Sequence, residues 1–355
     1  FLAGDKDIDD LLIRPASFYE KSAIQFKQGR VTALDRQQQK VTLNDGTQLH
    51  YDKLALCLGA RVRTAWLTGE NLAGVHYLRN IADIQAIKPY VVQGKRAVII
   101  GGGYIGLETA ASLKKLGMEV VVLEMAERVL QRVTAPEMSE FYTRIHQQQG
   151  VAIYTQMTVS EIVGEEQVRA VKCADGREFL ADLVIIGIGV VPNVELAEQA
   201  GLEVNNGVVV DEFGQTNDAN IVAAGDCANH FNAIYGRRMR LESVPNASDQ
   251  AKSAAAAICG VHKPYKSLPW FWSDQYDLKL QIAGLSQGYD QVVIRGDSLN
   301  GRSFAAFYLQ QGKLIAADCI NRPQEFMLSK KIIAENLPVD AARLVDESIP
   351  VKELV

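Results

Sequence analysis

The sequence predicts an α/β protein of two or three domains, and three observations lead to that fold class. The stretch Arg96–Glu124 contains an apolar β-branched run, a glycine-rich turn, a helix-period segment and a second apolar run, which together form a βαβ unit. The chain has 355 residues, 48% of them hydrophobic, which is enough for more than one core. Residues 267–355 carry alternating runs that are typical of an antiparallel sheet.

A glycine fingerprint follows the first strand of the βαβ unit. Ala97–Ile100 is apolar, and Gly101, Gly103 and Gly106 then follow in G-x-G-x-x-G order before the helix. In such a unit the first glycine permits a tight turn, the second lets the backbone approach a pyrophosphate, and the third lets the helix pack on the strand. Phosphates bind at the N-terminus of such a helix, where N–H groups point outward. The flanking strand and helix therefore favour a dinucleotide site over a glycine-rich turn without a ligand.

The second strand of the unit indicates which dinucleotide is bound. Val120–Leu123 is apolar and ends at Glu124. A carboxylate at this position can bind both ribose hydroxyls and repels a 2′-phosphate. The sequence therefore favours NAD over NADP.

The composition argues against several other classes of protein. A net charge of −5, with both signs interspersed, gives no general attraction to nucleic acid or anionic lipid. The longest apolar runs are far shorter than the roughly 20 residues of a membrane-spanning helix, and no signal peptide opens the chain, so we expect a cytoplasmic protein. The cysteines lack C-x-x-C or metal-knuckle spacing, and we expect them to be buried reduced thiols without a metal: Cys57, Cys173, Cys227, Cys259 and Cys319.

Short β runs dominate the part of the chain before the fingerprint. Residues 1–26 predict a loop, a short helix and a strand at Ile24–Phe26. Further strands are expected at Arg30–Asp35, Lys40–Leu43, Gln48–His50 and Lys53–Leu58. The last of these runs into Gly59-Ala60-Arg61, a tight turn that can hold a ligand's phosphate or ring but that is more simply a loop on its own. A strand and helix over His76–Ile87 then lead into the fingerprint.

The nucleotide unit continues beyond Glu124 with regular elements. We expect a helix at Ala135–Gln149, a strand at Val151–Tyr154, a meander with turns at Gly164 and Asp175-Gly176, and a strand at Ala181–Gly187. Gly187 and Gly189 at the end of that strand suit either close backbone approach to a ligand or a structural turn.

Two features of residues 200–266 can serve a ligand. After the run Val208–Val210, a second apolar strand, Ile221–Ala224, ends in Gly225-Asp226 and so places a carboxylate at a sheet edge, where it can accept hydrogen bonds from sugar or ribityl hydroxyls. Ser243–Ile258 predicts a loop and an Ala-rich helix whose first N–H groups can face an electron-rich ring, although an ordinary packed helix fits equally well.

The last segment changes character. Aromatic residues cluster at 270–276, and we expect an antiparallel sheet followed by a helix at Pro323–Glu335. The sheet's expected strands are Leu278–Gly284, Gln291–Gly296, Ser303–Gln310 and Lys313–Ile320.

Four motifs, in order along the chain, resemble the FAD-dependent NADH:ferredoxin reductases of bacterial oxygenase systems. They are G-G-G-Y-I-G-L-E at 101–108, A-A-G-D-C-A at 223–228, E-S-V-P-N-A at 242–247 and P-W-F-W-S-D-Q-Y at 269–276. The tryptophan motif is the most specific of the four. The resemblance implies hydride transfer from NADH to FAD, then single electrons passed to a two-iron ferredoxin.

The resemblance also implies an architecture: two nucleotide-binding Rossmann-like domains, with the FAD domain split by an inserted NAD domain, and a small α+β C-terminal domain. The expected boundaries are 1–76 and 200–266 for the FAD domain, 77–199 for the NAD domain and 267–355 for the C-terminal domain. The family's amino-terminal FAD fingerprint has no counterpart in this sequence, so the FAD domain is expected to be incomplete.

The resemblance assigns a role to residues at both cofactors. Asp226 would accept hydrogen bonds from the FAD ribityl chain, and Arg61 would lie near the FAD phosphates. Val244, Pro245 and Trp272 would lie against the isoalloxazine.

At the NAD site, Tyr104 and Glu108 would face the junction of nicotinamide and flavin, while Glu124 and Arg132 would hold the adenosine half. We treat Tyr104, Glu108 and Trp272 as the catalytic candidates; no general acid–base residue is required, because the cofactors supply the chemistry. The simpler alternatives are a surface acid at Glu108, a solvated charge at Arg132 and core packing at Trp272.

The ferredoxins of such systems are acidic, so a basic docking face is expected. The candidates are Arg237, Arg238 and Arg240, with Arg295, Arg322, Lys330 and Lys331 as further members.

Two other functions remain open. An NADH-dependent peroxidase or disulfide reductase shares the fold but uses a cysteine near the flavin, which this sequence does not show. A flavin-free NAD-binding or docking module would bind NADH without electron transfer and would be colourless.

Overall fold

A computed structural model describes residues 1–354 of the chain, which divides into two compact units. The first unit contains Ala3–Arg61 and Val191–Ser267, and the second contains Val62–Val190 together with the chain from Leu268 onward. The expected division into three domains, with boundaries at residues 76, 199 and 266, stays a prediction.

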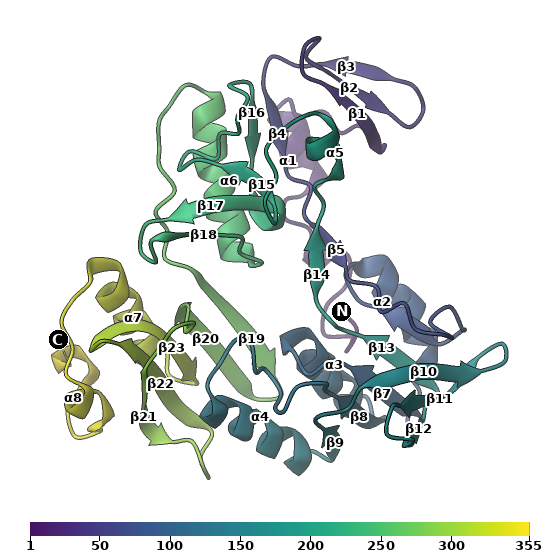
Figure 1. Cartoon of the computed structure of the whole chain (residues 1–355), viewed down its shortest axis with the longest axis vertical. Helices are drawn as coiled ribbons and strands as arrows, with labels where there is room; N and C mark the ends of the chain where they lie inside the picture. Colours follow the sequence, from purple (N-terminus) through teal and green to yellow (C-terminus); the bar gives the residue numbers. More distant parts are fainter. Residues whose placement is uncertain (355) are drawn as a thin grey trace. The chain divides into compact units, whose positions relative to one another are not determined.

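The second unit is built on a five-stranded parallel sheet with strand order β6-β13-β7-β8-β9 (Figure 1). The central strands β7 and β13 are apolar and almost wholly buried, as expected where helices cover both faces. Helix α3 follows β7, so the predicted βαβ unit is confirmed. The elements are β6 (Val75–Tyr77), α2 (Ile81–Ile87), η2 (Lys88–Tyr90), β7 (Arg96–Ile100), α3 (Tyr104–Lys115), β8 (Glu119–Leu123), α4 (Pro136–Gln148), β9 (Val151–Tyr154) and β13 (Leu183–Ile186).

A three-stranded antiparallel meander, β10-β11-β12, lies between β9 and β13 along the chain. On β11 only Arg169 and Lys172 are exposed, and they lie on opposite faces of the strand, so both faces of the meander are partly covered. Its turns occur where the glycines predict them. The strands are β10 (Val159–Gly164), β11 (Val168–Cys173) and β12 (Glu178–Leu180).

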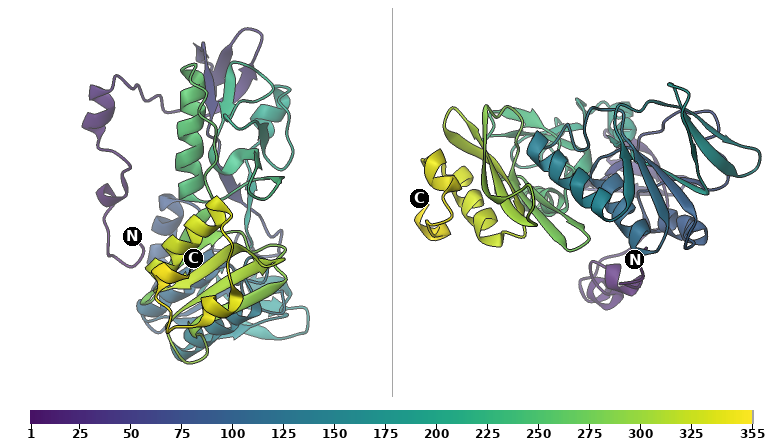
Figure 2. Two further views of the ribbon diagram at one scale, coloured as in Figure 1. Left: turned by 90° about the vertical axis from the view of Figure 1, so that its left-hand side faces the viewer. Right: turned by 90° about the horizontal axis from the view of Figure 1, so that it is seen from below.

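The C-terminal sheet has the order β19-β20-β23-β22-β21 and is wholly antiparallel. Its strand β22 buries both faces in different cores: Phe304, Ala306 and Tyr308 join the core formed with α3 and α4, whereas Ala305 and Phe307 join the core formed with α7. Figure 2 shows α7 lying across one face of this sheet. The elements are β19 (Trp270–Gln275), β20 (Leu278–Gly284), β21 (Gln291–Asp297), β22 (Ser303–Gln310), β23 (Lys313–Ile320), α7 (Pro323–Glu335), α8 (Ala341–Val345) and η4 (Val351–Glu353).

The first unit contains short sheets and one long helix, α6. Strand β4 pairs in parallel with β16, and β15 pairs in parallel with β17, which is followed by the antiparallel edge β18. Its elements are η1 (Asp9–Leu11), α1 (Ala16–Lys21), β1 (Val31–Asp35), β2 (Lys40–Leu43), β3 (Gln48–His50), β4 (Leu54–Leu56), α5 (Glu195–Gln199), β15 (Val208–Val210), β16 (Ile221–Ala223), η3 (Gly225–Cys227), β17 (Ala228–Asn232), β18 (Arg237–Met239) and α6 (Val244–Ile258). Strands β5 (Ala60–Val62) and β14 (Val190–Pro192) form a separate pair.

Three predictions about these elements were wrong. No strand forms at Ile24–Phe26, where both apolar ends are exposed and no neighbouring strand supplies hydrogen bonds. Ala60 and Arg61 continue as strand β5, although Gly59 does adopt a left-handed φ of 62°. Cys57 and Cys259 are exposed rather than buried, because one lies beyond the end of β4 and the other is the C-cap of α6.

Candidate functional site

The three fingerprint glycines occupy different environments in the second unit. A Cβ on Gly106 would lie 2.1 Å from the Gly101 carbonyl oxygen, and one on Gly101 would lie 2.4 Å from the Gly187 carbonyl oxygen. Gly101 also has a φ of +114°. These two glycines therefore allow the backbone segments to pack closely. A Cβ on Gly103 would meet no atom within 4 Å, so the space in front of that residue is open.

Helix α3 begins behind this open space without a side-chain cap. Its N-cap residue is Gly103, which has no side chain to bond the first-turn N–H groups. Such groups, together with the helix dipole, attract an anion. The open cradle at Gly103 and the uncapped helix therefore fit the pyrophosphate of a dinucleotide.

Glu124 is held at the edge of the glycine loop. Its Oε2 accepts a hydrogen bond of 2.6 Å from the Gly102 N–H, and its Oε1 accepts one of 2.8 Å from the Ala126 N–H. Each oxygen keeps a further lone pair for a ribose hydroxyl. Arg132 is exposed and follows this segment in a turn region.

The second glycine pair, Gly187 and Gly189, occupies two different environments. Gly187 donates from its N–H to the Ile100 carbonyl oxygen at 2.8 Å and backs directly onto Gly101, so it is a packing glycine. Gly189 has a φ of +103° and open space at its Cβ position, which leaves its backbone accessible.

Tyr104 and Glu108 lie one turn apart on α3 and both contact strand β19. The Tyr104 ring packs edge-on against Phe271 with centroids 5.2 Å apart, and its hydroxyl is buried without a hydrogen-bond partner among residues 1–354. Glu108 Oε1 accepts a hydrogen bond of 2.5 Å from Ser273 Oγ. Burial raises the pKa of the Glu108 carboxyl above its ordinary value, while the Ser273 hydrogen bond opposes that rise.

Trp272 projects from the opposite face of β19, because successive side chains alternate along a strand and Ser273 faces α3. Its side chain is 41% exposed, and its ring lies 5.9 Å from that of Trp270. Trp272 is therefore not the simple core residue that the alternative reading described.

In the first unit, Asp226 lies in the short helix η3 directly after strand β16. The preceding Gly225 donates from its N–H to Gln250 Oε1 at 2.8 Å, which joins this turn to helix α6. The Asp226 backbone oxygen accepts from Arg240 Nη1 at 3.1 Å. These bonds fix the strand end that carries the Asp226 carboxylate.

Helix α6 begins with an exposed apolar tip. Ser243 caps it, its Oγ accepting from the Asn246 N–H at 3.2 Å, and Pro245 lies in the first turn. Val244 is 68% exposed although it is apolar. Arg61, also in this unit, forms a 2.6 Å ion pair with Glu195 and a 2.9 Å hydrogen bond to Asn193.

Comparison with known proteins identifies the family. The family model "Pyridine nucleotide-disulphide oxidoreductase" matches residues 4–251, and "Reductase C-terminal" matches residues 270–355. The chain belongs to this oxidoreductase family. It is 45% identical to putidaredoxin reductase of Pseudomonas putida, and the match covers 100% of this chain and 86% of that relative. It is 42% identical to the ferredoxin reductase subunit of a Sphingobium 5,5′-dehydrodivanillate O-demethylase, and that match covers 100% of this chain and 87% of the relative. Among solved structures, a covalent putidaredoxin reductase–putidaredoxin complex matches 99% of this chain and 86% of that chain, with a TM-score of 0.96 and 44% identity.

Members of this family use FAD and NAD(H), and the fold predicted from the sequence is confirmed. The residues of the first unit fit a flavin as those of the second fit NAD. Val244 and Pro245 offer an apolar surface, and the side chain of His230, 1% exposed, keeps an Nε2 without a partner among residues 1–354.

Sequence reasoning did not single out His230. It lies on β17, its Nδ1 is 3.2 Å from Gln250 Nε2, and burial lowers its pKa to about 4. The only sequence signal was a histidine placed six residues after the end of the apolar Ile221–Ala224 run, which is weak without the fold.

The predicted docking cations differ widely in accessibility. Arg237 is exposed, whereas the Arg240 side chain is 9% exposed and pairs with Glu242 at 2.7 Å. Arg238 donates to the Val210 and Asn229 carbonyl oxygens. Arg295 is buried beside Glu325, so it cannot present its charge at a docking surface.

The remaining cations lie on helix α7 or at its start. Lys330 lies 4.8 Å from the centre of the Trp270 ring, and Lys331 is exposed. Arg322 pairs with Glu325 and Glu347.

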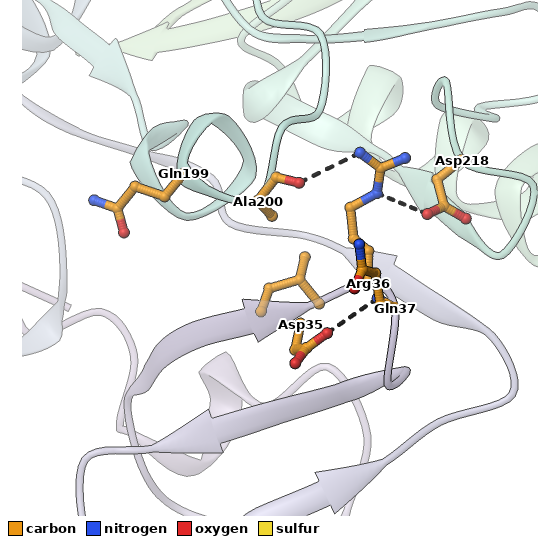
Figure 3. A pocket seen from close by; sticks show the side chains of 7 residues that line it. Asp35, Arg36, Gln37, Gln199, Ala200 and Asp218 are labelled. Carbon is orange, nitrogen blue, oxygen red and sulfur yellow. Dashed lines mark hydrogen bonds and ion pairs between the residues drawn. The ribbon is translucent and has the colours of Figure 1, made fainter.

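A hollow of about 640 Å³ in the first unit is lined by none of these residues (Figure 3). Arg36 crosses it and binds Asp218 at 2.7 Å and the Gly201 carbonyl oxygen at 2.9 Å. The charge of Arg36 is therefore compensated within the unit.

No metal-binding group of His, Cys, Asp and Glu side chains occurs within residues 1–354. No helix in that part of the chain is long and apolar enough to cross a membrane.

Proposed function

We propose that this chain carries electrons from NADH through FAD to a two-iron ferredoxin that serves an oxygenase. The observation that carries the proposal is the similarity to ferredoxin reductases over 100% of this chain, which spans both the nucleotide-binding region and the C-terminal region. The uncapped α3 and the open space at Gly103 support the NADH half of the proposal.

The residues of the second unit bind and orient NADH. The N–H groups at the start of α3 hold the pyrophosphate, and Gly103 leaves room for it. Glu124 and Arg132 hold the adenosine half, with Glu124 also rejecting a 2′-phosphate. Tyr104 and Glu108 lie at the nicotinamide end, where the β19 contacts hold them in place.

The residues of the first unit bind FAD. Asp226 accepts from ribityl hydroxyls, Val244 and Pro245 contact the ring, and Arg61 assists at the phosphates when it leaves Glu195. We assign Trp272 to the flavin ring as well. When bound, FAD supplies the chemistry, since it accepts a hydride and releases electrons singly. The protein excludes water and positions the rings, and no side chain needs to transfer a proton.

The ferredoxin docks on basic side chains. Arg237 and Lys330 are the strongest candidates, because neither has a carboxylate within salt-bridge distance among residues 1–354. Arg238, Arg240 and Arg322 shape the same surfaces but are tied to carbonyl groups or to acids, so we expect smaller contributions from them.

We also propose a cytoplasmic location. All five cysteines are free thiols in the structure, as expected in a reducing compartment.

The first experiment joins an intact mass to a visible absorption spectrum of the protein, recorded before and after anaerobic addition of NADH. Flavin bands that bleach, followed by reduction of an added two-iron ferredoxin, are the expected result. A colourless protein, or a flavin that NADH does not bleach, would refute the proposal. One relative is a rubredoxin reductase, 35% identical over 91% of this chain, so rubredoxin is the matched control acceptor and should be reduced more slowly.

A further inference from the structure

A chain of hydrogen bonds runs through the buried contact between α3, α4 and the β19–β20 hairpin. Tyr276 OH lies 2.9 Å from His146 Nδ1, and His146 Nε2 lies 2.8 Å from Gln275 Oε1. Gln275 Nε2 lies 3.1 Å from Ser273 Oγ, which in turn lies 2.5 Å from Glu108 Oε1. We name these five residues the Glu108 relay. All of them belong to the second unit.

The inner members of the relay are almost inaccessible to water. His146 is 0% exposed, and Gln275 and Ser273 are each 1% exposed. Ser273 and Gln275 are inward-facing polar residues on β19, positions that a strand normally fills with apolar side chains. Tyr276, at the turn after β19, has a left-handed φ of 58°, which is rare for a bulky residue. Inward polar residues and a strained backbone at one place indicate a function beyond packing.

The chemistry of the members fixes the direction of the hydrogen bonds. Gln275 Oε1 can only accept, so His146 Nε2 carries the proton. Burial lowers the pKa of His146, which keeps the ring neutral and leaves Nδ1 to accept from Tyr276. Gln275 Nε2 then donates to Ser273 Oγ, and the Ser273 hydroxyl donates to Glu108. Every proton therefore points toward Glu108.

If the hydrogen bonds of the relay ran in the opposite direction, the proton on the His146 ring would lie on the other nitrogen. If the Gln275 amide turned over, Ser273 would donate to Gln275, Glu108 would have to be protonated, and His146 would carry its proton on Nδ1. The position of the proton on His146 therefore reports the charge of Glu108, although the two residues lie on different helices.

We propose that Tyr276, His146, Gln275 and Ser273 are positioning residues that hold the Glu108 carboxylate ionised and in one orientation at the nicotinamide end of the NAD site. The link to nicotinamide rests on the proposed function, whereas the relay itself does not. An ionised carboxylate in a fixed orientation accepts a hydrogen bond from the carboxamide N–H of nicotinamide, which binds and orients the ring for hydride transfer.

The first test is independent of activity. In the full-length protein with ¹⁵N-labelled histidine, the ring nitrogens of His146 are assigned by their loss in His146→Gln. We expect a neutral ring at pH 7 with the proton on Nε2. A proton on Nδ1, or a doubly protonated ring, would overturn the proposed direction of the relay.

The second test separates positioning from general support of the fold. His146→Gln keeps an N–H donor near the Nε2 position, whereas His146→Leu fills similar space without one. We expect Ser273→Ala and His146→Leu to raise the KM for NADH and the Kd for NAD⁺ about tenfold, with kcat changed less than about threefold. His146→Gln should restore both constants to within about threefold of wild type. Equal effects of His146→Gln and His146→Leu would show a merely structural role.

Tyr276→Phe and Tyr142→Phe complete the test. Tyr276→Phe removes the donor at the far end of the relay and should raise KM about threefold while freeing the His146 ring to exchange its proton position. Tyr142 lies on helix α4, as His146 does, and its buried hydroxyl has no hydrogen-bond partner among residues 1–354. Tyr142→Phe should therefore leave the Kd for NAD⁺ unchanged.

The outcomes distinguish the relay from the proposed function. If NADH bleaches the flavin of the wild type but Ser273→Ala binds NAD⁺ normally, the relay proposal fails and the function stands. If NADH leaves the flavin unchanged while His146 carries its proton on Nε2 and the Kd for NAD⁺ follows the expected order, the function fails and the relay stands.

Discussion

The two helices that we assign to the cofactors, α3 and α6, begin in different ways. Helix α3 starts at Gly103, which has no side chain to cap it and open space in front of it. Helix α6 starts at Ser243, whose own Oγ accepts from the helix, and presents the exposed Val244 at its tip. An uncapped start with open space suits a phosphate, and a capped start with an apolar tip suits a flat ring. We infer from this comparison that the residues around a helix start, more than its dipole, decide which part of a dinucleotide it receives.

The largest effect that tests this comparison is expected at Gly106. In Gly106→Ala the new Cβ would lie 2.1 Å from the Gly101 carbonyl oxygen, so helix and strand must separate. We expect a loss of about 3 kcal/mol in the free energy of unfolding and no measurable NADH binding. Denaturant unfolding and NAD⁺ titration measure the two effects.

Gly103→Ala is the matched control, because its Cβ meets nothing within 4 Å. We expect stability within about 1 kcal/mol of wild type but NADH affinity at least about tenfold weaker, since the methyl group occupies phosphate space. If Gly103→Ala bound NADH with wild-type affinity, the assignment of α3 as the phosphate-binding helix would be wrong.

His230, which is bonded to α6, and Asp318, which lies in the core beside α3, should change the free energy of unfolding with pH in opposite directions. His230, bonded to Gln250 of α6, has its pKa lowered to about 4 by burial and then by Arg238. Asp318, which accepts from Thr134 and Tyr308 in the core beside α3, has its pKa raised to about 6 by burial. The folded state thus binds fewer protons at His230, and more protons at Asp318, than the unfolded state does over the intervening pH range.

Stability from His230 is therefore present above its unfolded pKa of about 6.5 and is lost as the pH falls toward 4. The destabilisation from charged Asp318 is present above pH 6 and is relieved as the pH falls toward 4. When the pH falls from 7 to 4.5, the free energy of unfolding of the wild type should decrease by about 2 to 3 kcal/mol relative to that of His230→Asn. Over the same range it should increase by about 2 kcal/mol relative to that of Asp318→Asn. Denaturant unfolding at both pH values checks the signs. Differences that do not change with pH would contradict both assignments.

Glu124→Ala tests the next part of the α3 site. The substitution removes the carboxylate that bonds the Gly102 and Ala126 N–H groups and repels a 2′-phosphate. We expect the preference for NADH over NADPH, measured as the ratio of kcat/KM values, to fall about tenfold or more.

Glu127→Ala is the control for that change, since Glu127 is an exposed acid on the same loop. It should leave the preference unchanged. An unchanged preference in Glu124→Ala would show that the assigned role of Glu124 is wrong.

The sequence predicted the features that form within one continuous segment, and it missed those that residues far apart in the sequence form together. The glycine cradle and Glu124 lie within one βαβ unit, so their spacing alone locates them. The C-terminal strands were predicted from runs of strand length, although the interior residues of β22 are buried on both faces rather than alternately. Strand β17 was not predicted, since Asn229, His230 and Asn232 break the apolar pattern while being buried by other elements. Similarly, His146 and Gln275 are 129 residues apart, and only the fold brings them together.

The smallest expected effect concerns the tip of α6. Val244→Glu places a charge at the helix start, where the dipole favours an acid, so the free energy of unfolding should stay within about 1 kcal/mol of wild type. The same charge would face the electron-rich ring that we assign to this tip, so FAD affinity should fall about tenfold. Flavin fluorescence during FAD titration measures this change. Val261→Glu, an exposed valine beyond the other end of α6, is the matched control and should bind FAD as wild type does. If Val244→Glu retained wild-type FAD affinity, the tip of α6 would not contact the flavin, and the contrast between the two helix starts would not reflect their ligands.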